Sequence, residues 1–228
     1  KWVQVVHTDP EELGMFKCYE NPFSIGAEKR GVEVELCSMA DFVVGVGPKL
    51  AKTTHKYLPF SKKQQDVFEF TPGVFDDLAR FQQVFDEGKQ CSVLVFGHGD
   101  ADEFGLRGFD IAAKSVAALS DAYLVFAGVH AREHRETRER FFCCGIPPFR
   151  LKVRSHVRSR EALMLLFCEV DVVLMPSRAE GFGLIGLEAL SAGLPVLVSK
   201  NSGFGEALLS VPFSSKYVID SEDPIAWT

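Results

Sequence analysis

The sequence predicts an α/β protein in which parallel, Rossmann-like sheets are wrapped by helices on both faces. Short runs rich in β-branched and aromatic residues alternate with helical patterns along nearly the whole chain, as in doubly wound folds. The 228 residues are 46% hydrophobic and 25% charged. This balance supports one or two buried cores and excludes a disordered or collagen-like chain.

An N-terminal group of elements comes first. Strands are expected at 3–7, 42–45 and 67–70, and helices at 28–39 and 49–57. The polar segment 86–90 then separates this group from a more regular series. We therefore predict a partial domain over 1–88 and a more complete domain over 89–228.

A three-stranded parallel sheet is incomplete, because it leaves an unpaired edge and an uncovered face. We expect this sheet to associate with a second copy of the chain. The apolar residues expected to be buried there are Phe42, Val44, Val67 and Phe70.

The second series contains enough strands for a whole doubly wound sheet. They are predicted at 93–96, 123–127, 151–157, 172–175, 196–199 and 217–219. Helices are predicted at 109–119, 132–143, 160–168, 185–192 and 205–210. In such sheets ligands bind at the carboxyl ends of the strands, so the loops after the strands are the candidate sites.

The composition excludes several classes of function. Acidic residues outnumber basic ones 31 to 25, so the molecule as a whole repels nucleic acids and anionic membranes. No apolar run is long enough to span a bilayer, and the first thirty residues lack the pattern of a secretory signal. Six cysteines without C-x-x-C spacing are expected to be buried thiols of a cytoplasmic protein. The chain reads as an excerpt of a longer protein.

The most informative segment follows the strand at 172–175. Gly181, Gly183 and Gly186 match the G-x-G-x-x-G pattern of dinucleotide-binding proteins. These glycines follow a loop on the fourth strand of the series, however, and Lys200 and Asn201 occupy the place of a ribose-binding acid. A dinucleotide site is therefore the weaker interpretation.

The two glutamates around these glycines favour a nucleotide sugar. Amides near Gly183 and Leu184 at the helix start can point at a diphosphate. Glu180 lies before that point and Glu188 about one turn into the helix, roughly 6 Å along its axis. One carboxylate can then bind the hydroxyls of a sugar and the other those of a ribose. The plainer alternative is a capped surface helix with two solvated glutamates.

The segment PSRAEGFGLIGLEALSAGLPV at 176–196 resembles the signature of retaining GT-B glycosyltransferases of the glycosyl transferases group 1 family. The resemblance extends to VLVFGH at 93–98, LRGFD at 106–110, ADFVV at 40–44 and NSGFGE at 201–206. It implies a GT-B-like fold, made of a C-terminal nucleotide-sugar domain and part of an acceptor-side domain.

The resemblance also implies roles for individual residues. Glu180 and Glu188 match the E-x7-E pair, whose first member contacts the transferred sugar and whose second contacts the ribose. The implied donor-binding set is Gly97, His98, Arg107, Glu180, Gly181, Phe182, Gly183, Leu184 and Glu188. Arg107, Glu180 and His7, which resembles a family histidine that faces the sugar, form the implied catalytic set. The alternative for His7 is an ordinary histidine at a strand end.

Two departures from the family pattern concern the diphosphate and the nucleotide pocket. The family has an arginine and a lysine in its GR...KG pattern, and this chain has His98 and Arg107 at those positions. A histidine is only partly protonated at neutral pH, whereas an arginine is permanently charged. A glycine usual after the third strand of the C-terminal domain is replaced by Ser155 or His156, which predicts a narrower nucleotide pocket.

Three other motifs have plainer explanations. Asp100 to Asp102 matches a metal-binding D-x-D, but a GT-B site needs no metal. His130 to His134 matches H-x-x-E-H, but a continuous helix and a third ligand would be needed. Arginines and glutamates that alternate over 132–140 are typical of an exposed helix face rather than of a nucleic-acid site.

These observations together predict a glycosyltransferase that moves a sugar from a nucleoside diphosphate sugar to an acceptor hydroxyl with retention, without a metal or cofactor. Two alternatives stay open, a catalytically silent nucleotide-sugar-binding module and an interaction domain of a larger protein. The donor base, the sugar and the acceptor are not readable from the sequence.

Overall fold

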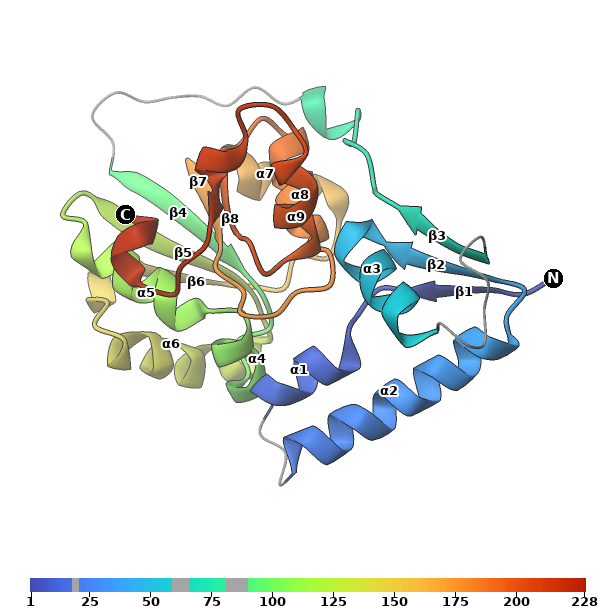
Figure 1. Ribbon diagram of the computed structural model, residues 1–228. Coiled ribbons are helices and arrows are strands. Elements are labelled where there is room, and N and C mark those ends of the chain that lie inside the picture. Colours follow the sequence, from blue (N-terminus) through green and yellow to red (C-terminus); the bar gives the residue numbers. More distant parts are fainter. Residues whose placement is uncertain (18–20, 59–65, 81–89) are drawn as a thin grey trace.

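The computed structural model describes residues 1–17, 21–58, 66–80 and 90–228, which form two parallel sheets beside each other (Figure 1). The smaller sheet has the order β1-β2-β3, with β1 (Val3–Val6), β2 (Phe42–Val46) and β3 (Val67–Phe70). The larger has the order β6-β5-β4-β7-β8-β9, with β4 (Cys91–Phe96), β5 (Ala122–Val129), β6 (Leu151–Ser155), β7 (Val172–Met175), β8 (Val196–Ser199) and β9 (Val218–Ile219).

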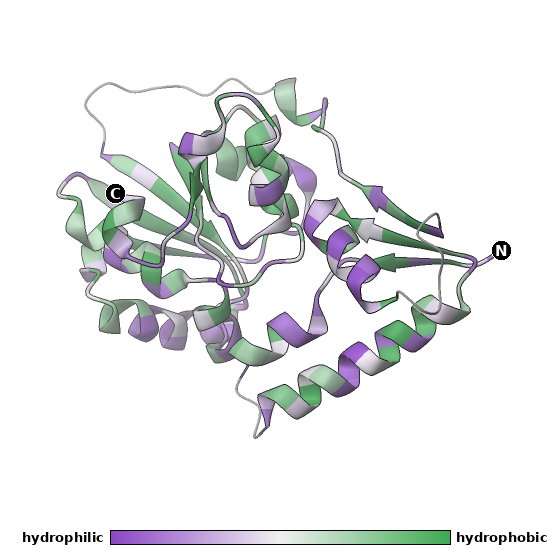
Figure 2. Ribbon diagram, viewed as in Figure 1, coloured by the Kyte–Doolittle hydropathy of each residue, from purple (hydrophilic) through white to green (hydrophobic). Residues whose placement is uncertain are grey.

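All of these strand pairs are parallel, and the strand order of the larger sheet reverses between β4 and β7. This is the doubly wound arrangement, so the predicted fold class is confirmed. Figure 2 shows the strands of both sheets as largely hydrophobic segments, as expected for the larger sheet, which is buried between helices.

The described part of the chain contains nine α-helices. They are α1 (Pro10–Phe16), α2 (Pro22–Met39), α3 (Gly47–Tyr57), α4 (Ala101–Leu106), α5 (Phe109–Ala118), α6 (His134–Cys143), α7 (Arg160–Cys168), α8 (Leu184–Ser191) and α9 (Gly203–Leu209). Helices α1 and α4 are not among the predicted helices, because they have only 7 and 6 residues and so show no periodicity. Their start signals are aspartate caps: Asp9 accepts from two amides of α1, and Asp100 accepts from the amide of Glu103 at 2.7 Å.

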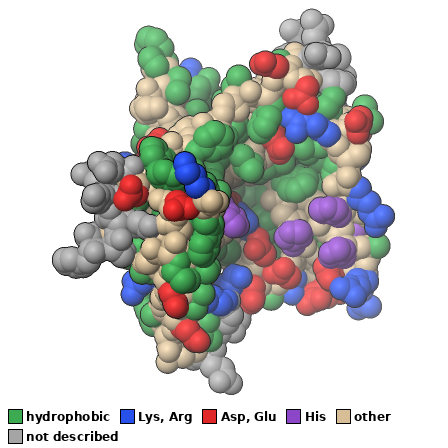
Figure 3. Space-filling view, turned by 90° about the vertical axis from the view of Figure 1, so that its right-hand side faces the viewer, with side chains coloured by type: hydrophobic (Ala, Val, Ile, Leu, Met, Phe, Trp, Pro, Cys, Tyr) green, Lys and Arg blue, Asp and Glu red, His purple; other side chains and the backbone are tan. Residues whose placement is uncertain are grey.

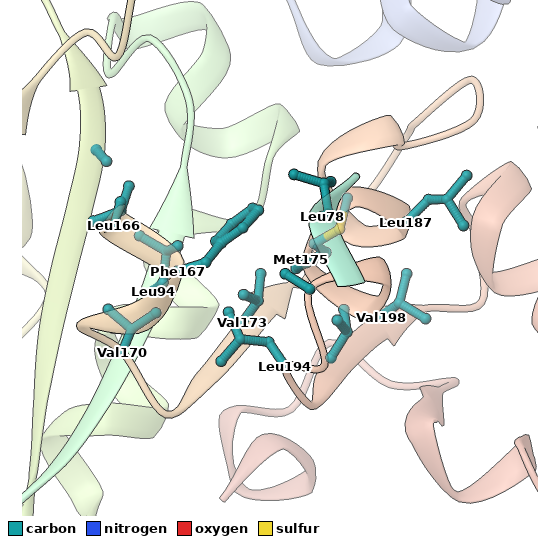
Figure 4. Packing of buried hydrophobic residues seen from close by; sticks show 14 of the residues in the cluster. Leu78, Leu94, Leu166, Phe167, Val170, Val173, Met175, Leu187, Leu194 and Val198 are labelled. Atoms are coloured by element: carbon teal, nitrogen blue, oxygen red, sulfur yellow. The ribbon is translucent and has the colours of Figure 1, made fainter. Parts of the chain in front are cut away.

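Helices cover both faces of the larger sheet. On one face, α5 and α6 enclose a core that includes Phe109, Phe126 and Phe141. On the other, α7, α8 and α9 enclose a second core. Leu78, which precedes the predicted domain boundary, is fully buried in this second core, where it lies close to Met175 (Figure 4). The boundary itself, between 88 and 89, falls outside the described residues.

Among the residues that the structure describes, helices cover one face of the smaller sheet. Helices α2 and α3 pack over Val43 and Val67 on that face. The opposite face exposes apolar side chains, namely Val3, Val5, Phe42, Phe68 and Phe70. The expectation that Val67 lies on the open face is wrong, because Val67 is 7% exposed and pairs with the buried Val43. Successive side chains of a strand alternate between faces, so Val67 and Phe68 point in opposite directions.

Two further expectations can be compared with the fold. Among the described cysteines only Cys37 is buried, and Cys91 and Cys143 are exposed, so the expectation of buried thiols is largely wrong. Among the helices of the described ranges, none combines the length and the apolar composition needed to cross a membrane.

Candidate nucleotide-sugar site

The predicted site residues gather where the strand order of the larger sheet reverses. The loop from β7 to α8 carries the glutamate and glycine motif, and the loop after β4 carries Gly97 and His98. The first of these loops is held by the neighbouring β8–α9 loop. The Gly203 amide donates to the Gly181 carbonyl at 3.0 Å, and the Phe204 amide donates to the Phe182 carbonyl at 2.7 Å.

The glycines of the motif allow neighbouring segments to pack closely against the loop and allow α8 to begin at Gly183. Gly183 caps α8 with φ +99°, a left-handed conformation that favours glycine. It has no side chain to accept from the amides of the first turn. The Gly186 amide donates to the Gly183 carbonyl at 3.1 Å, so the Leu184 and Ile185 amides are the ones that can face an anionic ligand. A Cβ atom on Gly181 would lie 2.3 Å from the carbonyl oxygen of His7, and one on Gly186 would lie 2.4 Å from the sulfur of Met175. Gly181 and Gly186 are therefore required for packing.

Glu180 is already paired in this structure. Its side chain, 14% exposed, forms an ion pair with Arg107. Arg107 also pairs with Glu103, one turn earlier in α4, at 2.8 Å. Gly108, the next residue, has φ +64° and lies against the carbonyl of Pro176, which brings the β4–α5 connection next to the β7–α8 loop. The permanent charge of Arg107 is thus shared by two carboxylates.

Glu188 lies half-buried on α8, and burial raises the pKa of its carboxyl group. Arg160 lowers that pKa and Asp77 raises it, both to a lesser degree than burial. Arg160 and Asp77 themselves pair at 2.6 Å. This pair could not be predicted from the sequence, because Asp77 precedes the larger sheet in the chain and no motif links it to α7.

Exposed histidines lie at the carboxyl ends of β4, β5 and β6. The rings of His98 and His156 are nearly parallel, with centroids 6.2 Å apart, and those of His130 and His156 are 6.4 Å apart. Figure 3 shows histidine side chains gathered beside a hollow in this face of the molecule. His156, one of the two residues predicted to replace a family glycine, therefore stands directly beside His98.

His7 lies at the end of β1 with an exposed side chain. Its carbonyl contacts Gly181, so the smaller sheet meets the β7–α8 loop at this residue. The backbone of His7 is therefore brought together with Arg107, Glu180 and Gly181 by the fold. The His7 ring acts on Glu33 of α2, whose pKa is raised by burial and lowered to a lesser degree by His7.

Phe182, Gly97 and Leu184 are predicted donor-binding residues for which the structure shows packing or an exposed side chain rather than a side-chain contact to the glutamate loop. Phe182 is 4% exposed and packs against Phe204 and Gly47, so only its backbone is available to a ligand. Gly97 lies against the ring of Phe109. Leu184 begins α8 with an exposed side chain.

The remaining motifs have structural explanations. Asp100 of the D-x-D match caps α4, and His134 of the H-x-x-E-H match lies 3.1 Å from the hydroxyl of Ser155. Within the described ranges, no group of three or more His, Cys, Asp or Glu side chains is arranged to hold a metal ion. The exposed α6 carries the expected pairs Arg135–Glu139 and Arg140–Glu136.

The two parallel sheets and their helices have the GT-B fold seen in solved glycosyltransferase structures. The solved structure of the Anabaena protein HepE with UDP and glucose matches 99% of this chain and 59% of its own, with a TM-score of 0.72 at 16% identity. Sucrose-phosphate synthase from Thermosynechococcus elongatus matches 99% of this chain and 56% of its own, with a TM-score of 0.72 at 17% identity. At these identities the likeness shows the fold.

The chain belongs to the family described as family 4 glycosyltransferases in conflict systems, whose model matches residues 1–223. A D-inositol 3-phosphate glycosyltransferase of Corynebacterium urealyticum is 39% identical over 70 residues, which are 31% of this chain and 16% of that protein. A GDP-mannose-dependent phosphatidylinositol dimannoside mannosyltransferase of Mycobacterium tuberculosis is 30% identical over 130 residues, 57% of this chain and 32% of that protein. The chain thus spans about a third or less of these curated relatives.

Proposed function

We propose that this chain binds a nucleoside diphosphate sugar between Glu180 and Glu188. The observation that supports the proposal is the ion pair of Arg107 with Glu180, which directly precedes the start of α8, while Glu188 lies within that helix. The open amides of α8 and the Arg107 guanidinium would bind the diphosphate. Glu180 would accept hydrogen bonds from the sugar and Glu188 from the ribose.

Arg107 would change partners during the reaction. In the ligand-free chain its charge is held by Glu180 and Glu103. A bound diphosphate is a stronger competitor for a guanidinium than a single carboxylate, because it offers several charged oxygens. The charge that develops on the departing diphosphate would then be stabilised by Arg107 and the start of α8, while Glu180 becomes free to orient the sugar.

We propose retention of the anomeric configuration and arrival of the acceptor hydroxyl from the side of His7, as the family resemblance implies. No metal or cofactor is included in this proposal. The proposed compartment is the cytoplasm, where cysteines without disulfide spacing are expected. A water-excluding wall on the acceptor side requires a complete second domain, so we expect the 228-residue chain alone to show no transfer.

A binding panel tests the proposal. The chain is titrated with UDP, GDP, UDP-glucose and GDP-mannose, first by thermal shift and then by calorimetry. We expect saturable binding of at least one sugar-bearing ligand, with loss of that binding in Glu188→Ala. A panel in which no ligand binds the folded chain would refute the proposal and leave the interaction-domain alternative.

A second candidate function is a catalytically silent nucleotide-sugar sensor. It is favoured by His98, which stands where the family has an arginine, and by the two carboxylates on Arg107. Both features weaken stabilisation of a leaving diphosphate. Turnover by the full-length protein with the donor chosen by the panel separates the enzyme from the sensor, since the sensor binds the donor without releasing the nucleoside diphosphate.

A further inference from the structure

The ammonium group of Lys49 joins three segments of the chain. Lys49 lies in the first turn of α3, and its side chain is 17% exposed. Its Nζ atom lies 2.7 Å from the Glu12 carboxylate and donates to the carbonyl oxygens of Glu180 at 3.1 Å and Asn201 at 2.5 Å. An ammonium group has three N–H donors. The Glu12 carboxylate and the two carbonyl groups therefore provide one acceptor group for each N–H of Lys49.

One carbonyl group belongs to the β7–α8 loop of the candidate site, and the other to the β8–α9 loop that holds it. Glu180 precedes the start of α8, and Asn201 precedes the start of α9. The two loops also form a bridge between Glu180 and Ser202. The bond to the Glu180 carbonyl is partly buried and the bond to the Asn201 carbonyl is exposed. Without a cation between them, the two carbonyl oxygens would lack a shared donor, and the partly buried Glu180 oxygen would bear the larger cost in free energy.

The third partner, Glu12, is itself held in place. Asp9 caps the helix that carries it, accepting from the Glu11 and Glu12 amides at 3.1 and 3.2 Å. Glu11, on the same helix, pairs with Arg30 of α2 and accepts from the hydroxyl of Tyr57 at 2.9 Å. Glu12 therefore offers Lys49 a fixed counter-charge from the N-terminal part of the molecule.

We propose that Lys49 is a positioning residue for Glu180. By holding the Glu180 and Asn201 carbonyls against the N-terminal part, it fixes where the Glu180 carboxylate lies relative to Arg107 and the start of α8. The effect of Lys49 on a bound ligand rests on the function proposed above, whereas its effect on the two loops does not.

Lys52 provides a matched control on the same helix. It also reaches from α3 to α9, where it pairs with Glu206. Its side chain is 72% exposed, and Glu206 is a side-chain partner on α9 rather than a backbone group of the Glu180 loop. Substitution of Lys52 thus removes a positive charge and a cross-link without loosening the loop.

The first experiment is amide hydrogen exchange on the ligand-free, folded chain with Lys49→Met and Lys52→Met. Methionine keeps the apolar stem and removes the donors. We expect the amides of Gly203 and Phe204, which donate to the Glu180 loop, to exchange about tenfold faster or more in Lys49→Met and at an unchanged rate in Lys52→Met. Unchanged protection in Lys49→Met, or an equal loss in both variants, would overturn the proposal.

The second experiment measures affinity for UDP and UDP-glucose, or for GDP and GDP-mannose if the panel selects guanine. We expect Lys49→Met to weaken the sugar-bearing ligand about tenfold more than the free diphosphate, because Glu180 contacts only the sugar. Equal weakening of both ligands would indicate a general loss of structure and would contradict the positioning role. If the unmodified chain binds neither sugar, the proposed function fails while the exchange result still decides on Lys49.

Glu12→Gln is the second variant if Lys49→Met does not fold. It removes the ion pair and keeps an amide oxygen as an acceptor for Lys49. We expect faster exchange of the Gly203 and Phe204 amides and weaker binding of the sugar-bearing ligand, with both effects smaller than in Lys49→Met. Exchange rates identical to those of the unmodified chain would count against the proposal.

Discussion

The guanidinium group of Arg107 forms an ion pair with the carboxylate of Glu180, across the two loops that meet at the reversal of the larger sheet. Both side chains are mostly buried, with 29% and 14% of their surface exposed. The pair joins a residue proposed to bind the diphosphate to one proposed to bind the sugar. Substitution of either residue therefore leaves the charge of the other without this partner. We expect substitutions of the two residues to have different effects on the affinity for the diphosphate and for the sugar.

Substitution of Glu180 and Glu188 should separate the two ends of the ligand. Glu188→Ala should weaken UDP and UDP-glucose alike, by about 1.5 to 3 kcal/mol or roughly ten- to a hundredfold. Glu180→Ala should weaken UDP-glucose by a similar factor but leave UDP unchanged or tighter, because Arg107 loses a competing carboxylate. Calorimetry with both ligands checks this. Equal weakening of free UDP by the two substitutions would rule out the assignment.

The affinity for the nucleotide should rise with pH through the titration of Glu188. Burial raises the pKa of this carboxyl group above the ordinary value of 4.5. The ionised form accepts charge-assisted hydrogen bonds from the ribose hydroxyls through both of its oxygens, and these bonds are stronger than those to the protonated acid. Affinity should therefore be lost as the pH falls through this raised pKa. The same burial makes the ionised form costly in the folded state, so Glu188→Gln should not lower the free energy of unfolding at neutral pH.

Titration of UDP over pH 4.5 to 7 measures the first effect, and chemical denaturation measures the second. Glu188→Gln should flatten the pH dependence over this range. Glu161→Gln, on an exposed first turn of α7, is the control and should leave the pH dependence as it is in the unmodified chain. A dependence that persists in Glu188→Gln would assign the titration to another group.

His98 should make the affinity for the diphosphate fall as the pH rises, which is opposite to the effect of Glu188. If it contacts the diphosphate, only its protonated ring attracts the anion, so affinity should be greater at pH 6 than at pH 8. His98→Arg should flatten the dependence and raise affinity at pH 8. A diphosphate affinity that does not vary between pH 6 and 8 in the unmodified chain would exclude His98 from the site.

We propose that the uncovered face of the smaller sheet makes the chain self-associate. Phe68 and Phe70 are 48% and 59% exposed on this face, and burial of such rings is favourable by about 25 cal/mol per Å². Light scattering should show dimers whose proportion rises with concentration and falls in the Phe68→Ser, Phe70→Ser double variant. Phe149→Ser, a change at an 86% exposed ring away from this sheet, should have no effect. A monomer at all concentrations would contradict the proposal.

The sequence by itself determined the fold class, the strands and the composition of the glutamate and glycine loop. The reason is that these features depend on short-range patterns. The helix at 160–168 and the strands at 172–175 and 196–199 were predicted with the observed bounds, because apolar runs and caps act within a few residues. The nine-residue segment from Glu180 to Glu188 likewise includes its own loop, helix start and both carboxylates.

Only the tertiary structure decided which side chains meet. Lys49 reaches the Glu180 carbonyl across 131 positions of the chain, Leu78 enters the core of the larger sheet, and Asp77 comes beside Arg160. Strand alternation also left open which face of the smaller sheet the helices cover, so Val67 was assigned to the wrong side. Such contacts depend on how whole elements pack against one another, and that packing is set by the summed burial of many residues rather than by any local spacing.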